Sequence, residues 1–142
     1  MGAASDTAIG RLHHIGLAIP DLDAAMAQYA RLPGASVGPE FTIPGLAYRL
    51  AYVELGGARL ELVQPTTTTS TAARYLEQHP AGGVYHIAYE VADVLAAATA
   101  LEAQGASIIG SREPRVEGDG HHVLVLDASR SHGTLIELRQ PQ

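Results

Sequence analysis

Internal duplication is the feature of this 142-residue sequence that most constrains its fold. Residues 12–19 and 84–91 are short apolar runs, and each contains a His-Ile pair followed by Gly or Ala. The two halves also close alike, with Leu-Glu-Leu-Val-Gln-Pro at 60–65 and Ile-Glu-Leu-Arg-Gln-Pro at 136–141. Two echoes at matching offsets indicate that one structural module occurs twice along the chain.

Short apolar or alternating runs in both halves predict β-strands. These predicted strands cover residues 14–19, 47–54, 59–63, 86–91, 122–126 and 134–138. Gly56-Gly57 lies between two of them and is a strong hairpin signal. The last two strands flank a longer loop, 127–133.

A helix is predicted directly after the first strand of each half. In the first half, Asp21 or Asp23 can cap a helix over residues 24–32. In the second half, a helix over 94–104 ends before Gly105, a residue suited to a helix C-terminus. Each half therefore predicts the order β-α-β-β-β, with a mostly antiparallel sheet, and the fold class is α+β.

The length suits one domain made of the two modules. Module one spans about 11–65, a linker covers 66–83, and module two spans about 84–141. The Thr-rich start of the linker is either a surface connector or the border of a ligand mouth. A short helix over 72–78 follows it.

Composition excludes several classes of function. Nine basic residues, all of them Arg, against fifteen acidic ones give a net charge of −6, which argues against nucleic-acid binding. The absence of Lys and Cys excludes Schiff-base lysines, thiolate nucleophiles and soft metal sites. No apolar run approaches the roughly 20 residues that span a bilayer, so we expect a cytoplasmic protein without a membrane partner. With one Phe and no Trp, the core must be aliphatic and rich in Ala.

Four residues repeat with the modules and have side chains that bind metals. His14 precedes Glu61 by 47 residues, and His86 precedes Glu137 by 51. If the first and last strands of each module are neighbours, and an approximate two-fold axis relates the modules, two imidazoles and two carboxylates converge. Such a set suits one divalent ion of Mn, Fe, Co, Ni or Zn, with positions left open.

An alternative applies to each of these residues taken singly. Strand alternation places Glu61 or Glu137 equally well on an exposed polar face, and a lone strand histidine is more often a polar surface residue than a ligand. The matched repetition favours ligation by all four.

The other histidines are assigned elsewhere. His13 points to the face opposite its neighbour and does not match the second module. We interpret His121 and His122 mainly as rim residues; the alternatives are that they orient a ligand or ligate through a rearranged loop. His79 and His132 are interpreted as solvated loop residues.

The repeated segments resemble the vicinal oxygen chelate (VOC, or glyoxalase) superfamily over nearly the whole chain. The segments that carry the resemblance are 14–23, 60–65, 86–91 and 134–138. The resemblance implies a half-open barrel of two βαβββ modules, with the metal on His14, Glu61, His86 and Glu137.

Within that superfamily the likeness is greatest to the methylmalonyl-CoA epimerases, through residues 72–77, 82–91 and Glu113-Pro114. Two loops depart from the epimerase pattern. No carboxylate lies between Phe41 and Tyr52, and the loop 128–134 has a changed sequence.

The resemblance implies a metal-dependent epimerase that acts by metal-stabilised enolate chemistry on a small substrate, for example an acyl-CoA thioester. Glu61 and Glu137 are the candidate acid and base, without a choice between them. Arg49, beside Tyr48, either holds a substrate carboxylate or is a solvated strand residue. The alternatives are a glyoxalase I-type isomerase or lyase and a non-enzymatic, resistance-type binding protein. A homodimer is expected.

Overall fold

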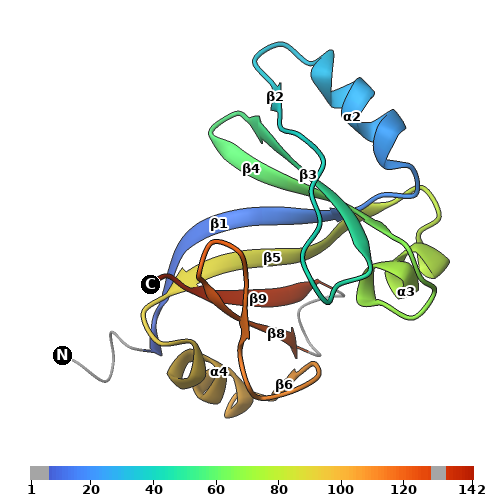
Figure 1. Ribbon diagram of the computed structural model, residues 1–142. Helices are drawn as coiled ribbons and strands as arrows, with labels where there is room; N and C mark the ends of the chain where they lie inside the picture. The colour runs from blue at the N-terminus through green and yellow to red at the C-terminus, as the bar shows by residue number, and fades with distance from the viewer. Residues whose placement is uncertain (1–6, 129–133) are drawn as a thin grey trace. The chain divides into compact units, whose positions relative to one another are not determined.

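The computed structural model describes residues 7–128 and 134–142, and within them three helices accompany a set of short and long strands (Figure 1). Along the chain the elements are β1 (Ile9–Ala18), α2 (Leu22–Ala30), β2 (Ser36–Val37), β3 (Tyr48–Leu55), β4 (Ala58–Pro65), α3 (Thr71–Gln78), β5 (Gly83–Val91), α4 (Val94–Glu102), β6 (Ala106–Ile108), β7 (Arg115–Val116), β8 (His122–Ala128) and β9 (Leu135–Gln140). No helix among these residues has the length and apolarity needed to cross a membrane.

The chain forms two compact units. The N-terminal unit is His14–Tyr85, and the C-terminal unit is His86–Gln142 together with the residues before His14. The α+β class predicted from the sequence is confirmed.

The N-terminal unit has the predicted order of elements, β1-α2-β2-β3-β4. Its strands lie in the order β2-β3-β4-β1, and only the β4–β1 pair is parallel. Gly56 and Gly57 adopt positive φ angles of 62° and 80° between β3 and β4. Two consecutive residues in that region make the tight turn that matches strand twist, so the hairpin prediction is confirmed.

The C-terminal unit repeats this arrangement with one addition. Its strands lie in the order β5-β9-β8-β6, and only the β5–β9 pair is parallel. The two-residue strand β7 was not predicted; it pairs with the start of β8, on the edge of β8 that also carries β6 and opposite β9. The loop expected at 127–133 lies mostly outside the described residues, which resume at Thr134.

An Asp and a Gln at equivalent positions accept hydrogen bonds from the start of the first helix in each unit. Asp21 and Asp93 are the N-caps of α2 and α4, and each accepts a hydrogen bond from a backbone N–H of the first turn. Gln64 and Gln140 accept a second one, from the first residue of the helix, at 2.8 and 2.9 Å. These bonds explain why the Gln of the repeated closing sequence occurs twice. Helix α2 therefore begins two residues before the predicted position.

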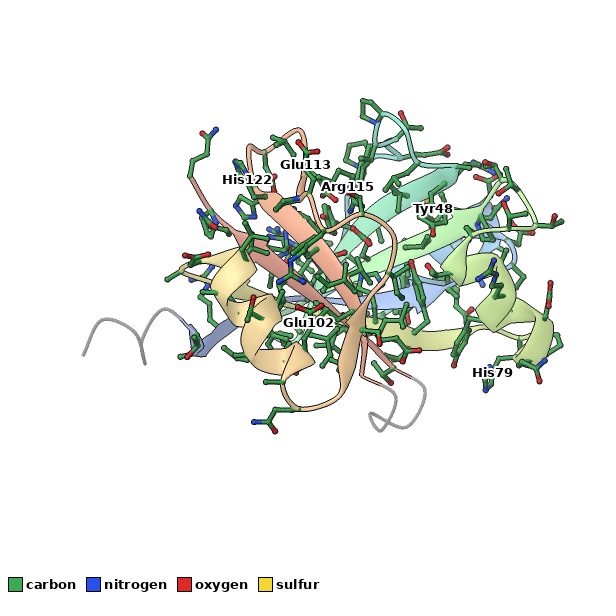
Figure 2. The ribbon with its side chains drawn as sticks, turned by 90° about the horizontal axis from the view of Figure 1, so that it is seen from below. Tyr48, His79, Glu102, Glu113, Arg115 and His122 are labelled. Carbon is green, nitrogen blue, oxygen red and sulfur yellow. The ribbon has the colours of Figure 1, made fainter. Side chains whose placement is uncertain are left out.

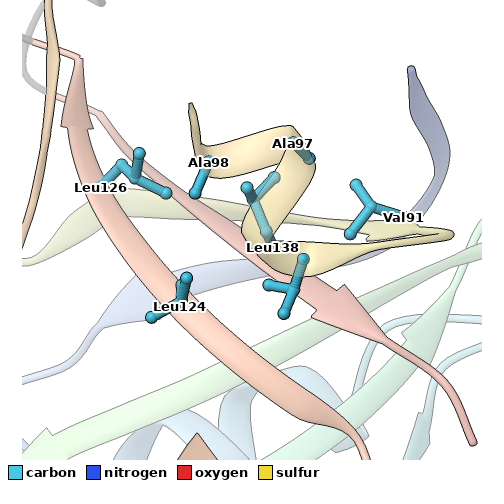
Figure 3. Packing of buried hydrophobic residues seen from close by; sticks show 7 residues of the cluster. Val91, Ala97, Ala98, Leu124, Leu126 and Leu138 are labelled. Atoms are coloured by element: carbon cyan, nitrogen blue, oxygen red, sulfur yellow. The ribbon is translucent and has the colours of Figure 1, made fainter. Parts of the chain in front are cut away.

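The core of the C-terminal unit lies between α4 and the sheet (Figure 3). Small side chains on the helix, Ala97 and Ala98, face Leu124, Leu126 and Leu138 on β8 and β9. Each fully buried Leu contributes roughly 1.5–3 kcal/mol relative to an exposed one. The N-terminal unit has a corresponding aliphatic cluster against α2, so the predicted Ala-rich, aliphatic core is confirmed.

Candidate functional site

In the N-terminal unit, His14 and Glu61 form a buried pair. Strands β1 and β4 are parallel, and Gly16 lies opposite Glu61 in their register. His14 is two residues before Gly16 and therefore shares a sheet face with Glu61. Its Nε2 is 3.6 Å from Glu61 Oε1. His14 is 0% exposed and Glu61 is 6% exposed.

In the C-terminal unit, His86 and Glu137 repeat this geometry. Ala88 lies opposite Glu137 in the parallel β5–β9 register, and His86 is again two residues earlier. His86 Nε2 is 3.9 Å from Glu137 Oε1, and both side chains are buried. The duplication has therefore produced the same histidine–carboxylate pair twice.

These pairs bear on two of the expectations drawn from the sequence. The first and last strands of each module are neighbours, as convergence of His and Glu requires. The alternative that the carboxylates line an exposed polar face is wrong, because Glu61 and Glu137 are both buried.

Burial sets the protonation of the second imidazole. Removal from water lowers the pKa of His86, and the negative charge of Glu137 opposes this effect without cancelling it. His86 is therefore neutral at neutral pH. A neutral imidazole has the nitrogen lone pair that a metal ligand needs.

A buried arginine supports Glu137 from the other side. Arg139, on β9 and 1% exposed, donates from Nη1 to Glu137 Oε2 at 2.8 Å. It also donates from Nη2 to Glu117 and Asp119 at 3.0 and 2.9 Å, and from Nε to His121 at 3.2 Å. Burial alone lowers the pKa of Arg139, but the neighbouring carboxylates outweigh it and raise the pKa above its ordinary value.

Sequence reasoning missed Arg139, Glu117 and Asp119. The one available signal was a mismatch in the repeat, because Val63 stands in module one where module two has Arg139. His121, predicted as a rim residue, is partly buried and accepts a hydrogen bond from Arg139.

The remaining histidines differ in their surroundings. His13 is partly buried, and its ring centroid is 5.5 Å from that of His121. His79, at the end of α3 in Figure 2, is exposed and stacks on Tyr75 at 4.2 Å between ring centroids. His122, also labelled in Figure 2, is exposed at the start of β8. His132 lies outside the described residues.

Arg49 is engaged by acidic residues of the chain itself. Its Nη2 is 2.7 Å from Glu40 Oε1 and 2.9 Å from Asp23 Oδ1. These bonds raise the pKa of Arg49, and the same guanidinium lowers the pKa of Glu40. A substrate carboxylate at Arg49 would compete with these two carboxylates. The neighbouring Tyr48 (Figure 2) shares a hydrogen bond with Thr71 at 3.3 Å.

Comparison with known proteins places this geometry in a family. Residues 13–125 match the model of the Glyoxalase/Bleomycin resistance protein/Dioxygenase superfamily. The ethylmalonyl-CoA/methylmalonyl-CoA epimerase of Cereibacter sphaeroides is 42% identical over 132 residues, which cover 93% of this chain and 98% of that protein. The mitochondrial methylmalonyl-CoA epimerase of Bos taurus is 34% identical over 98% of this chain and 79% of its own length.

Solved structures agree with the sequence relatives. A variant of the Streptomyces coelicolor methylmalonyl-CoA epimerase, in complex with 2-nitronate-propionyl-CoA, superposes with a TM-score of 0.80. It is 30% identical, and the match covers 94% of this chain and 96% of that one.

Proposed function

Because the chain belongs to the glyoxalase, or VOC, superfamily and is an epimerase of that superfamily, we propose that it inverts C2 of a 2-alkylmalonyl-CoA thioester. Methylmalonyl-CoA and ethylmalonyl-CoA are the proposed substrates, since they appear in the name of a relative with 42% identity. The observation that carries the proposal is the buried histidine–carboxylate pair present once in each unit. The expected homodimer and the cytoplasmic location stay predictions.

We further propose that His14, Glu61, His86 and Glu137 together hold one divalent ion of Co, Mn, Ni, Zn or Fe. Metal–ligand bonds of about 2.0–2.2 Å put two ligand atoms of one ion at most about 4 Å apart. The nitrogen–oxygen distances of 3.6 and 3.9 Å within the pairs fit this range. When bound, the cation would supply positive charge that stabilises an enolate oxygen.

The two carboxylates provide the proton chemistry in this proposal. One of Glu61 and Glu137 takes the proton from C2, and the electron pair of the broken C–H bond moves into the thioester carbonyl. The other carboxylate, protonated at the start of the turnover, gives its proton to the opposite face of C2. The enolate electron pair forms the new C–H bond, and exchange of protons with solvent restores the two carboxylates. No covalent bond to the protein is needed, which agrees with the absence of Cys and Lys.

Exchange of the C2 proton of methylmalonyl-CoA in D₂O, followed by mass spectrometry, tests the proposal. We expect exchange that a chelator abolishes and added Co²⁺ restores. His86→Ala and Glu137→Ala should lose exchange and Co²⁺ binding together, whereas His79→Ala, at an exposed position, is the matched control.

Other outcomes point to the alternative functions. No exchange of either thioester, together with isomerisation of a hemithioacetal, would replace the proposal with a glyoxalase I-type reaction. Failure to bind any divalent metal would favour a ligand-binding protein instead.

A further inference from the structure

Arg139 is a buried charge that the proposed reaction does not use directly. It lies two residues after Glu137 on β9, and therefore on the same sheet face. We propose that Arg139 is a positioning residue, which orients the Glu137 carboxylate so that Oε1 is the oxygen that binds the metal. This inference rests on the proposed function, because it takes Glu137 as a ligand.

The two carboxylate oxygens of Glu137 have different neighbours. Arg139 Nη1 holds Oε2 at 2.8 Å, while Oε1 is the oxygen 3.9 Å from His86 Nε2. A carboxylate held by one oxygen presents the other in a fixed direction. Hydrogen bonds of this kind to a metal ligand orient it, and their loss typically weakens metal affinity by about 10–100-fold.

Arg139 is itself held by the turn between β7 and β8. Glu117 and Asp119 accept from its Nη2, and His121 accepts from its Nε. The turn is closed by bonds of its own, from the Glu117 N–H to the His121 carbonyl at 3.0 Å and from the His121 N–H to Asp119 Oδ1 at 2.9 Å. Arg115, labelled in Figure 2, pairs with the second oxygen of Glu117. The fork of Arg139 is thus fixed at three points besides Glu137.

A purely structural role for Arg139 is weakened by the other repeat. Val63 occupies the equivalent position in the N-terminal unit and is 0% exposed. The same βαβββ arrangement therefore forms with an apolar residue at this place. A fully buried Arg that needs three acidic side chains beside it is not required by the fold.

Co²⁺ binding tests the inference with a readout other than activity. Calorimetry gives the dissociation constant, and the visible absorption of bound Co²⁺ reports its coordination. We expect Arg139→Met to weaken binding at least about 10-fold and to change the spectrum. Arg139→Lys, which keeps the charge without the fork, should recover part of the affinity. Arg112→Met is the matched control, because it removes an Arg ion pair with Glu102 in the same unit.

The outcomes separate this inference from the function it rests on. If folded Arg139→Met binds Co²⁺ with unchanged affinity and spectrum, the positioning role is wrong and the metal site stands. If the Met variant does not fold, Arg139→Lys decides, and an unchanged affinity and spectrum there would equally overturn the inference. If the unsubstituted protein binds no Co²⁺, the metal proposal fails and the inference falls with it.

Discussion

The two units of the molecule carry the same pair of side chains in different surroundings. In the N-terminal unit, Tyr52 lies opposite Glu61 across the β3–β4 register, and it stacks on Phe41 with ring centroids 5.0 Å apart. In the C-terminal unit, Val125 takes the place of Tyr52 beside Glu137, and Arg139 holds the carboxylate.

The difference teaches which parts of a duplicated module are constrained. The histidine, the carboxylate, the helix cap and the Gln that bonds to the helix are kept in both units. The residues that surround the carboxylate have diverged, from an aromatic group in one unit to a network of charges in the other. Substitutions made in matched pairs show how far the equivalence extends.

The largest expected effect follows from neutralising either carboxylate. Glu61→Gln and Glu137→Gln should each slow C2 proton exchange by about 10²–10⁴-fold, because each is proposed to transfer a proton on one face. Exchange should be measured separately with the two C2 epimers in D₂O. If one variant retains full exchange with both epimers, the carboxylates are not equivalent and only the other is an acid or base.

The next effect is on stability, and it concerns Val63, whose equivalent in the other unit is Arg139. The strand neighbours of Val63 are Ala18 and Leu50, both buried and apolar. An arginine there would have Glu61 two residues away but no acidic partner at the paired positions of β1 and β3. Val63→Arg should lower the free energy of unfolding by about 3–5 kcal/mol, measured by urea denaturation. Val63→Met is the control for added volume. An equal loss in both variants would mean that size, rather than charge, distinguishes Val63 from Arg139.

Metal removal should have an intermediate effect. An ion that binds only the folded protein stabilises it by about 2.7 kcal/mol at a concentration of 100 times Kd. Thermal unfolding with Co²⁺ and with a chelator should therefore give clearly different midpoints, and His14→Ala and His86→Ala should both abolish the difference. A metal-dependent shift that survives in one variant would place the ion on the other unit alone.

How much of this could be read from the sequence depends on the range of the contacts involved. The His–Glu pairs were predictable because repetition marked them and strand pairing alone brings each pair together. The start of α2 was misplaced because Gln64, 42 residues away, bonds to its first N–H. Arg139 was missed because its partners lie on a turn about 20 residues earlier. The position of that turn depends on the unpredicted strand β7.

The smallest expected effect is the most direct test of equivalence between the repeats. Asp21 and Asp93 make the same cap, accepting from Ala24 and Ala96 at 3.1 and 3.0 Å on exposed helix ends. Asp21→Ala and Asp93→Ala should each reduce the free energy of unfolding by about 1 kcal/mol, and by equal amounts within a few tenths. Glu77→Ala, an exposed acid within α3, controls for the loss of one negative charge. In each unit a glutamine from the last strand also accepts a hydrogen bond from the start of the helix. Unequal losses would therefore mean that one glutamine compensates for the missing aspartate better than the other. The duplication would then have preserved the two hydrogen bonds in each unit but not their relative contributions to the stability of the helix start.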